Sequence, residues 1–462
     1  MVKRSRISSV RTGAALCAPF AFLVSLVLLV PPAGGQEADY YGEVRKGELF
    51  RIPVVIEDFT NGTPAGSGEV LFSGGQRAED VLARDLTFTD IVQAVRERSG
   101  APREAGPRLD VDGQPIARPV QARVRGRWSH ARGGPRLAME LIDETSGRTI
   151  VECDYPLFPD GETQPDRWQI HLWADEVTRY LTGSPGCAAS RIAFVRETEG
   201  GKELFLVDWD GAEEEPVTEF GSILVAPSWH PSGRRLIFTS YHQEQPSLVS
   251  FDLPGRRMVT ISAAKTPTAA AYSPNGRQVA FAATTSGDAE IFVSRFDGSQ
   301  ARRLTMHPGI DTAPSWSPSG NRLVFTSDRG GTPQLYIMDA DGSNLVPLTS
   351  GESGRWNDSP DWSSDGRRIV YVNGLDGRFD LALVGADGLG WRRLTEGGGC
   401  EDPHWAPDGR HVVFARKTGG VRNLWVIDTD SGRLRQLTAS RAHTYNPAWS
   451  PVTEKRIRAS GG

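Results

Sequence analysis

Short apolar runs alternate with turn residues throughout the second half of this 462-residue chain. In one unit, Leu323–Ser327 is a run rich in β-branched and aromatic residues, which predicts a strand. A turn at 328–331 leads to a second run at 334–338. Asp341-Gly342 then predicts a tight turn, because glycine tolerates the positive φ required there. The pattern predicts several short strands in each unit.

Each unit is introduced by an aromatic residue followed by a Ser-Pro-x-Gly-like turn. The six aromatic residues are Trp229, Tyr272, Trp316, Trp362, Trp405 and Trp449. Successive members are 43, 44, 46, 43 and 44 residues apart. A period of about 40–45 residues with several strands per unit is typical of propeller blades. Because the tryptophans share this periodic context, we expect them to pack between neighbouring blades rather than to bind carbohydrate.

The two ends of the repeat region predict how the ring closes. The first unit begins at Ile192–Val195, a strand with no aromatic segment before it, whereas Trp449 has no strands after it. We therefore expect the segment around Trp449 to complete the first blade. A closed six-bladed β-propeller of this kind leaves no sheet edge open to pairing.

Residues 37–185 do not repeat, and their pattern is typical of a small α/β domain. The expected elements are a strand at 51–56, a helix over 77–95 interrupted near 87–90, strands at 119–126, 136–143 and 149–152, and a helix over 168–181. A linker at Thr182–Gly186 follows. We therefore expect a mainly β protein, with an α/β domain over 36–185, a six-bladed β-propeller over 186–452 and a tail at 453–462.

The N-terminus has the composition of an export signal. Four basic residues precede an apolar run from Ala14 to Val30, and Pro31–Gly35 supplies small residues at the expected cleavage point. The alternative is an uncleaved membrane anchor, but this run of 17 residues is short for a span of about 20. We expect residues 1–35 to be a signal peptide that is removed on export.

Net charge disfavours one class of partner, and the cysteines bear on disulfides and on zinc binding. The formal net charge of −5 becomes −9 when the four basic residues of the signal are removed, which disfavours binding to nucleic acid. Cys153, Cys187 and Cys400 remain, and their spacing leaves open whether any two form a disulfide or all stay as thiols. The sequence contains no CxxC, so it does not support a structural zinc site.

Enzyme motifs are absent from the sequence. It contains no G-x-S-x-G elbow, P-loop or H-E-x-x-H. His230 and His404 lie within repeat motifs, where we expect packing or turn roles. We therefore predict that the protein is not an enzyme and has no catalytic residues, cofactor or metal.

The order of these parts resembles the TolB family. The resemblance rests on Tyr180–Gly186, Arg191–Val195, Ile52–Phe59, Leu82–Leu86 and the Pro-x-Trp-Ser-Pro-x-Gly repeats. It implies a monomeric periplasmic adaptor of a Tol–Pal system that supports outer-membrane integrity and constriction at division. The implied partners are a Pal-like peptidoglycan-associated lipoprotein and inner-membrane Tol proteins, with membrane contact only through these partners.

The resemblance also implies two partner-binding regions. Tol proteins would bind the N-terminal segment containing Tyr41, Glu43, Val44 and Arg45. The Pal-like lipoprotein would bind at the propeller mouth, in loops before the aromatic repeat positions. The implied mouth residues are Thr266, Thr268, Ala269, Asp311, Thr312, Asn357, Asp358, Glu401, Asp402 and Asn446.

Two alternatives follow from departures from the family pattern. The stretch Thr266–Ala269 differs from the usual family loop, and the segment between Asp58 and Arg77 is unusual in length and glycine content. A paralogue acting as a periplasmic sensor or as a carbohydrate- or peptide-binding module is the first alternative, and a degenerate hydrolase-associated propeller is the second. The carboxylates at the mouth would suit a basic partner or a hard cation such as calcium, or would simply be solvated.

Overall fold

The computed structural model describes residues 51–61, 77–97, 109–116, 119–131, 134–156, 167–243, 245–261, 265–284, 287–350 and 355–453. The expected signal peptide lies outside these residues, as do Tyr41, Glu43, Val44 and Arg45 and nearly all of the expected tail. All of the described residues belong to one compact unit. In the part of the chain that the structure describes, neither helix is long and apolar enough to cross a membrane.

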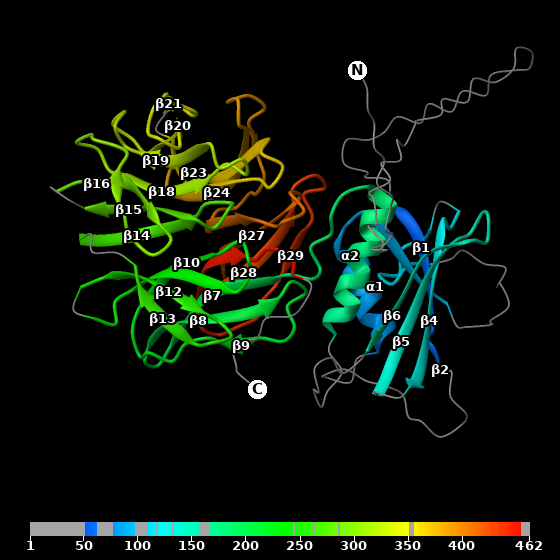
Figure 1. The fold of residues 1–462 in the computed structure, drawn as a ribbon. Coiled ribbons are helices and arrows are strands. Elements are labelled where there is room, and N and C mark those ends of the chain that lie inside the picture. The colour runs from blue at the N-terminus through cyan, green and yellow to red at the C-terminus, as the bar shows by residue number, and fades with distance from the viewer. Residues whose placement is uncertain are drawn as a thin grey trace, which may run out of the picture. The chain divides into compact units, whose positions relative to one another are not determined.

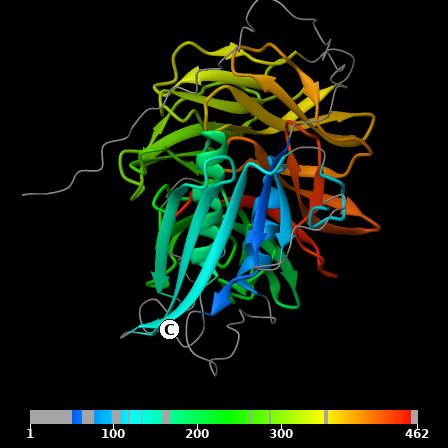
Figure 2. The same cartoon turned by 90° about the vertical axis from the view of Figure 1, so that its right-hand side faces the viewer.

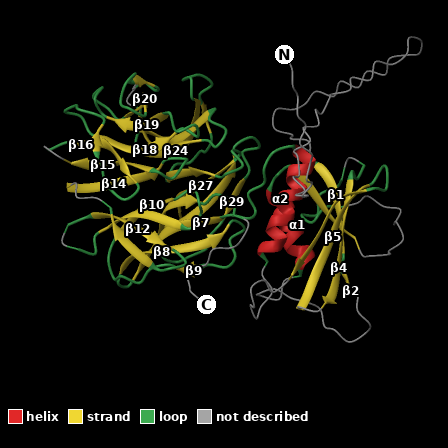
Figure 3. Cartoon of the chain, in the orientation of Figure 1, coloured by secondary structure: helices red, strands yellow, loops and turns green. Residues whose placement is uncertain are grey.

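The first part of the described chain is a mixed sheet with two helices on one face (Figures 1 and 3). Its strands are β1 (Ile52–Glu57), β2 (Thr60–Asn61), β3 (Val92–Glu97), β4 (Ala122–Ala131), β5 (Gly134–Asp143) and β6 (Thr149–Pro156). The strand order is β3-β1-β4-β5-β6, with β2 paired to β4. Strand β1 is parallel to both β3 and β4, whereas β4, β5 and β6 are antiparallel. These strands, blue to cyan, lie side by side in Figure 2.

The expected helix over 77–95 is wrong beyond Phe88. Helix α1 (Ala78–Phe88) ends there, and the chain continues as strand β3. The Thr89 hydroxyl donates to the Leu86 carbonyl and accepts the N–H groups of Ile91 and Val92, which ends the helical bonding. Asp90 then adopts a left-handed φ of 55°, and Val92–Glu97 pairs with β1. The local side-chain bonding thus breaks an apolar pattern that would also fit a helix.

Helix α2 (Trp168–Thr182) lies against α1 and ends where the sequence predicts. Gly183 adopts a φ of 73°, and its N–H donates to the Arg179 carbonyl, which is the common glycine-based helix ending. The buried side chains of both helices, including Leu82, Leu86 and Trp173, share one hydrophobic core with the sheet. Apolar burial therefore fixes the helices on that face of the sheet.

The rest of the described chain forms six four-stranded sheets, which confirms the six-bladed β-propeller. Blade 1 consists of β30 (Thr444–Trp449), β7 (Arg191–Thr198), β8 (Gly201–Asp208) and β9 (Glu215–Pro216). Blade 2 consists of β10 (Leu224–Trp229), β11 (Arg235–Ser240), β12 (Ser247–Asp252) and β13 (Arg257–Thr260). Blade 3 consists of β14 (Lys265–Tyr272), β15 (Gln278–Thr284), β16 (Ala289–Arg295) and β17 (Arg302–Arg303).

The remaining blades repeat this order. Blade 4 consists of β18 (Asp311–Trp316), β19 (Arg322–Ser327), β20 (Gln334–Asp339) and β21 (Val346–Pro347). Blade 5 consists of β22 (Trp356–Trp362), β23 (Arg368–Leu375), β24 (Arg378–Gly385) and β25 (Arg392–Arg393). Blade 6 consists of β26 (Cys400–Trp405), β27 (His411–Thr418), β28 (Val421–Asp428) and β29 (Leu434–Gln436).

The ring closes as the sequence predicts. Strand β30, from the C-terminal end of the repeats, pairs antiparallel with β7, from their beginning. The register joins Thr444 to Arg196 and Trp449 to Ile192. Blade 1 is therefore built from both ends of the repeat region, and the edge of β7 is covered.

The repeat aromatics pack between blades, which also confirms a prediction. All six are buried, and three indole N–H groups donate to a carbonyl of the preceding blade. Trp229 donates to Ala448 at 3.0 Å, Trp316 to Ala271 at 3.1 Å and Trp405 to Asp361 at 3.1 Å. Each of these side chains thus combines apolar burial with a satisfied polar group.

Candidate partner-binding site at the propeller channel

The six first strands of the blades are neighbours around the ring and line its centre. These inner strands are β30, β10, β14, β18, β22 and β26, and each contacts the next. All six carry the same irregularity three residues before the repeat aromatic. The residues concerned are Ala226, Ala269, Ala313, Ser359, Asp402 and Asn446, each with a left-handed φ between 44 and 52°. The pairing register with the second strand breaks at this same place in every blade.

The repetition of this bulge makes it a property of the fold. A non-glycine residue at positive φ is strained, and six copies at one position require a common cause. A bulge bends a strand and redirects the side chains beside it. The chain therefore uses the same local strain in all six blades to shape its inner strands.

The predicted mouth residues lie on these inner strands rather than in loops before them. Thr266, Thr268 and Ala269 are on β14, Asp311 and Thr312 on β18, Asn357 and Asp358 on β22, Glu401 and Asp402 on β26, and Asn446 on β30. The expectation of loops was wrong because the strands continue pairing across the bulge. The structure nevertheless brings these residues to one ring, since the inner strands are neighbours.

Two of the predicted mouth residues have buried side chains. Asp311 is fully buried and accepts a hydrogen bond from Nη2 of Arg329 at 2.7 Å. Asn357 is buried in a chain of side-chain amides, donating to Gln334 and accepting from Asn373, each at 2.7 Å. These contacts assign Asp311 and Asn357 to the support of the ring. Thr266 is exposed, and Thr268, Ala269, Thr312, Asp358, Glu401, Asp402 and Asn446 are half-buried.

Three carboxylates on neighbouring inner strands form what we call the acidic arc: Asp358, Glu401 and Asp402. Asp402 accepts hydrogen bonds from the side chain of Asn446 at 2.7 Å and from its backbone N–H at 3.3 Å. Glu401 pairs with Arg422 at 2.7 Å. Burial, together with the charges of Glu401 and Asp358, raises the pKa of Asp402 to about 6. The acidic arc therefore loses negative charge when the pH falls through this value.

An aromatic residue beside the acidic arc was not predicted. Tyr445 lies on β30, at the repeat position that Thr312, Asp358 and Glu401 occupy in other blades. Lys202 Nζ lies over the Tyr445 ring, 4.0 Å from its centroid. The Tyr445 hydroxyl donates to Glu197. Alignment of the six repeats by their aromatic position would have identified Tyr445 from the sequence.

Polar contacts tie the inner strands together beneath this ring. The Asp361 carboxylate on β22 accepts from the Ser315 hydroxyl on β18 at 2.9 Å and from the backbone N–H of Trp405 on β26 at 2.8 Å. His404 Nδ1 lies 3.3 Å from the Trp449 N–H on β30 and accepts it. His230 contacts the Tyr272 ring and hydrogen-bonds Ser232 in its own turn. The expected packing and turn role is confirmed for His230, whereas His404 lies in strand β26 and hydrogen-bonds the neighbouring strand β30.

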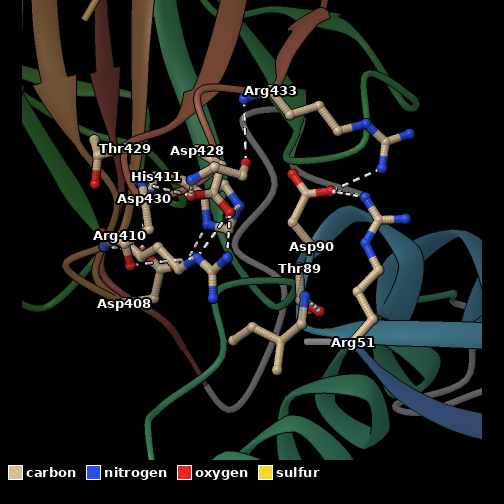
Figure 4. Close-up of polar contacts among 12 residues, drawn as sticks. Arg51, Thr89, Asp90, Asp408, Arg410, His411, Asp428, Thr429, Asp430 and Arg433 are labelled. Carbon is tan, nitrogen blue, oxygen red and sulfur yellow. Dashed lines mark hydrogen bonds and ion pairs between the residues drawn. The ribbon is translucent and has the colours of Figure 1, made fainter. Parts of the chain in front are cut away.

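A second polar region joins the α/β sheet region to the propeller, and the sequence did not reveal it. Asp85 of α1 contacts His171 Nδ1 of α2 at 2.6 Å and accepts from the Trp209 indole of blade 1 at 3.0 Å. Burial lowers the pKa of His171, but the charges of Asp85 and Asp210 outweigh burial and raise it to about 8. Asp90 accepts from Arg51 at 3.1 Å and from Arg433 of blade 6 at 2.7 Å (Figure 4).

The sequence left open whether two cysteines form a disulfide or all stay as thiols, and the structure has the second arrangement. Cys153, Cys187 and Cys400 are all free thiols in the structure. Cys187 and Cys400 are buried, and Cys153 is half-buried. Burial raises the pKa of the Cys153 thiol to about 12 and that of Cys400 to about 11, so both stay protonated at neutral pH.

Comparison with known proteins gives matches over the repeat region. Residues 178–453 match the family of the TolB beta propeller domain. The Tol-Pal system protein TolB of Anaeromyxobacter dehalogenans (strain 2CP-C) is 33% identical over 299 residues, which cover 63% of this chain and 65% of that protein. The Tol-Pal system protein TolB of Anaeromyxobacter sp. (strain K) is 36% identical with the same coverage. The similarity thus spans about 65% of the length of these relatives.

Among solved structures, TolB from Acinetobacter baumannii resembles the chain over most of its length. The match has a TM-score of 0.71 and covers 88% of this chain and 98% of that protein. The sequences are 23% identical over this match, so it demonstrates a shared fold.

Proposed function

This chain belongs to the TolB β-propeller family, and we propose that it is a non-enzymatic periplasmic adaptor of a Tol–Pal system. The match of residues 178–453 to the TolB propeller carries this proposal. A monomer would bind a Pal-like peptidoglycan-associated lipoprotein at the channel, and inner-membrane Tol proteins through the segment with Tyr41, Glu43, Val44 and Arg45. The complex would support outer-membrane integrity and constriction at division.

The ring of inner-strand residues supports the placement of the lipoprotein site. Thr312, Asp358, Glu401, Asp402 and Asn446 are half-buried at one ring, so their side chains reach solvent from a rigid support. The acidic arc supplies three carboxylates on β22 and β26. A partner surface with basic groups and hydrogen-bond donors would complement it.

A pull-down from envelope extract tests the proposal. The bait is the mature protein from Gln36 onward, and the prey is the extract of its own host. We expect the bait to recover a Pal-like lipoprotein. A Thr312→Arg/Asp358→Arg double variant should lose it, because two bulky cations would clash with a surface that complements the acidic arc.

The matched control carries the same changes away from the channel. Thr260→Arg/Glu152→Arg alters exposed positions on the outer strand β13 and on β6, and it should bind like the unaltered bait. Failure of the unaltered bait to recover any such lipoprotein would reject the Tol–Pal function while leaving the family membership intact. Retention of binding by the Thr312/Asp358 variant would move the site away from the channel.

One cavity favours a second candidate function, the binding of a small carbohydrate or peptide. It has a volume of about 410 Å³ and lies between blades 4 and 5, with Arg355, Tyr371, Asn373 and Trp391 in its lining. Trp391 is 46% exposed, with Arg355 over its ring at 5.3 Å, and a partly exposed aromatic ring beside a cation suits a small polar ligand. Binding of peptidoglycan fragments without any protein partner, lost in Trp391→Ala, would favour this function over the adaptor.

A further inference from the structure

Three side chains with different metal-binding atoms meet where the linker reaches the propeller. Cys187 lies in the linker between α2 and β7, Asp408 in the turn between β26 and β27, and His411 at the start of β27. Cys187 is 2% exposed and His411 3% exposed. One atom from each residue lies within 4.8 Å of the other two. Sulfur, carboxylate oxygen and imidazole nitrogen therefore converge in a buried place.

We propose that Cys187, Asp408 and His411 form a binding site for a zinc-like transition-metal ion. Zinc in proteins takes cysteine, histidine and carboxylate ligands, and three protein ligands leave a fourth position for water. Nothing in the family membership or in the proposed adaptor function requires such a site.

The distances between the three atoms are close to those of a tetrahedral site. Metal bonds of about 2.0–2.3 Å place neighbouring ligand atoms about 3.3–3.5 Å apart. Cys187 Sγ lies 3.3 Å from Asp408 Oδ2, which already fits. His411 Nδ1 lies 2.6 Å from the same oxygen, so this pair would have to separate by about 0.7 Å. That movement is within reach of a rotation of the imidazole ring.

The contacts behind these ligands have the arrangement expected around a metal. Asp408 Oδ1 accepts the N–H groups of Arg410 at 2.8 Å and His411 at 3.0 Å, which fixes the carboxylate with Oδ2 directed at the other two ligands. A metal-bound histidine usually donates its second ring N–H to a carboxylate or carbonyl. A metal site here therefore requires such a group beside Nε2 of His411.

His411 Nε2 faces such a carboxylate but is not hydrogen-bonded to it. This buried nitrogen has no hydrogen-bond partner within the described ranges. It lies 3.9 Å from Oδ2 of Asp428, a carboxylate that Arg410 holds in place with a 2.7 Å hydrogen bond (Figure 4). Coordination through Nδ1 places the remaining proton on Nε2, which faces Asp428. The orphaned nitrogen is an observation independent of the three-ligand cluster.

A hydrogen-bonded triad without metal is the competing explanation, and the thiol argues against it. Asp408 already accepts from His411 and from two backbone N–H groups, so it does not need a further donor. A serine at position 187 would donate a stronger hydrogen bond than a thiol does. A thiol exceeds a hydroxyl in its affinity for zinc, which explains cysteine at this position.

The ligands also explain why no metal motif was visible in the sequence. Cys187 and Asp408 are 221 residues apart, and only Asp408 and His411 are close together along the chain. A bound ion would tie the linker to blade 6. It would thereby stabilise the protein against unfolding, because an ion that binds only the folded chain adds its binding free energy to stability.

Cobalt titration of the metal-free mature protein tests the site. Cobalt(II) replaces zinc at such sites and absorbs visibly, with an additional near-ultraviolet band when a thiolate is a ligand. Because the site is buried, the protein is refolded in the presence of Co²⁺ or Zn²⁺. We expect one Co²⁺ per chain with a thiolate band, displacement of Co²⁺ by Zn²⁺, and a higher Tm with Zn²⁺ than with EDTA.

Matched cysteine variants locate the ligand. Cys153→Ser and Cys400→Ser should keep the thiolate band and the zinc-dependent rise in Tm, whereas Cys187→Ser should lose both. His411→Gln should weaken Zn²⁺ binding at least tenfold. Absence of a stoichiometric thiolate band in the unaltered protein, or its persistence in Cys187→Ser, would overturn the proposal.

A second measurement covers the case in which Cys187→Ser does not fold. X-ray absorption of the unaltered zinc-loaded protein should show one sulfur at about 2.3 Å together with nitrogen or oxygen ligands. A spectrum with only nitrogen and oxygen ligands would show that the cysteine does not bind the ion, and the assignment would fail.

Discussion

The buried histidine of α2 makes the stability of the fold depend on pH. His171 is fully buried between Asp85 and Asp208, with Nε2 3.9 Å from Oδ2 of Asp208 and Nδ1 2.6 Å from Asp85. Its pKa of about 8 exceeds the ordinary value of 6.5. Protonation of His171 therefore stabilises the folded protein fully below pH 6.5, and this contribution is lost as pH rises through 8.

Unfolding by urea across a pH series measures this effect. Between pH 6 and 9 the free energy of unfolding should fall by about 2 kcal/mol through His171, following about 1.4 kcal/mol for each pKa unit. His171→Gln should remove this part of the decline. His242→Gln, which changes an exposed histidine, should retain it. Equal declines in the unaltered protein and in His171→Gln would contradict the assignment.

A second pH effect belongs to the acidic arc and rests on the proposed adaptor function. Asp402 has a pKa of about 6, so most of its negative charge is lost between pH 7.5 and 5.5. The Kd for a basic partner should rise roughly two- to fivefold over this range, the usual contribution of one partly exposed ion pair. Calorimetric titration at both pH values measures it. In Asp402→Asn the two Kd values should agree, and a persisting difference would point to another group.

The sequence alone could not predict the side-chain contacts behind these effects. Asp85 and His171 are 86 residues apart, and Cys187 and Asp408 are 221 apart. Each residue alone lies in an unremarkable local pattern, and only the packing of the α/β region against the propeller brings them together. The repeat, by contrast, predicts that the tryptophans are buried between blades, because it places each of them at the same position of its blade.

At the scale of the element, sequence patterns do not predict the bulge of the inner strands. The short strands were predicted correctly, but the residues before each aromatic were expected in loops. Ala313 and its counterparts keep their strands paired on both sides of a left-handed residue. Helix α1 shows the same limit, because Thr89 and Asp90 end a pattern that apolar spacing alone would continue.

Glycine substitution distinguishes the strained position from its neighbours. Ala313 has a φ of 50°, so Ala313→Gly should leave stability unchanged or raise it by up to about 1 kcal/mol. Ala271 stands in the inner strand β14 without positive φ, so Ala271→Gly should lower stability by about 1 kcal/mol. Urea unfolding of both variants measures the contrast. A similar loss at both positions would show that the bulge is not strained.

At the scale of the whole molecule, we expect closure of the ring to contribute strongly to stability. Strand β30 covers the edge of β7, buries Trp449 and provides the Ala448 carbonyl that accepts from Trp229. Truncation before Thr444 removes all three contributions. The free energy of unfolding should fall by at least about 4 kcal/mol, the cost typical of losing one buried tryptophan alone.

Thermal unfolding of two truncated proteins tests the closure. Truncation after Thr453 keeps β30 and the hydrogen bond from the Trp168 indole to the Thr453 carbonyl, so its Tm should match that of the full mature chain. Truncation before Thr444 should lower Tm sharply or prevent folding. Equal Tm values for the two would show that β30 contributes little.

The closure of blade 1 also sets the order in which the chain can fold. The backbone N–H of Arg191 donates to the hydroxyl of Ser450, 259 residues later, so the first blade of the ring lacks its inner strand until the last repeat has been made. During that interval the edge of β7 is open to wrong partners. Contacts across so long a stretch of chain make folding slow. The protein should therefore fold more slowly, and depend more on chaperones, than a propeller whose blades are each continuous in sequence.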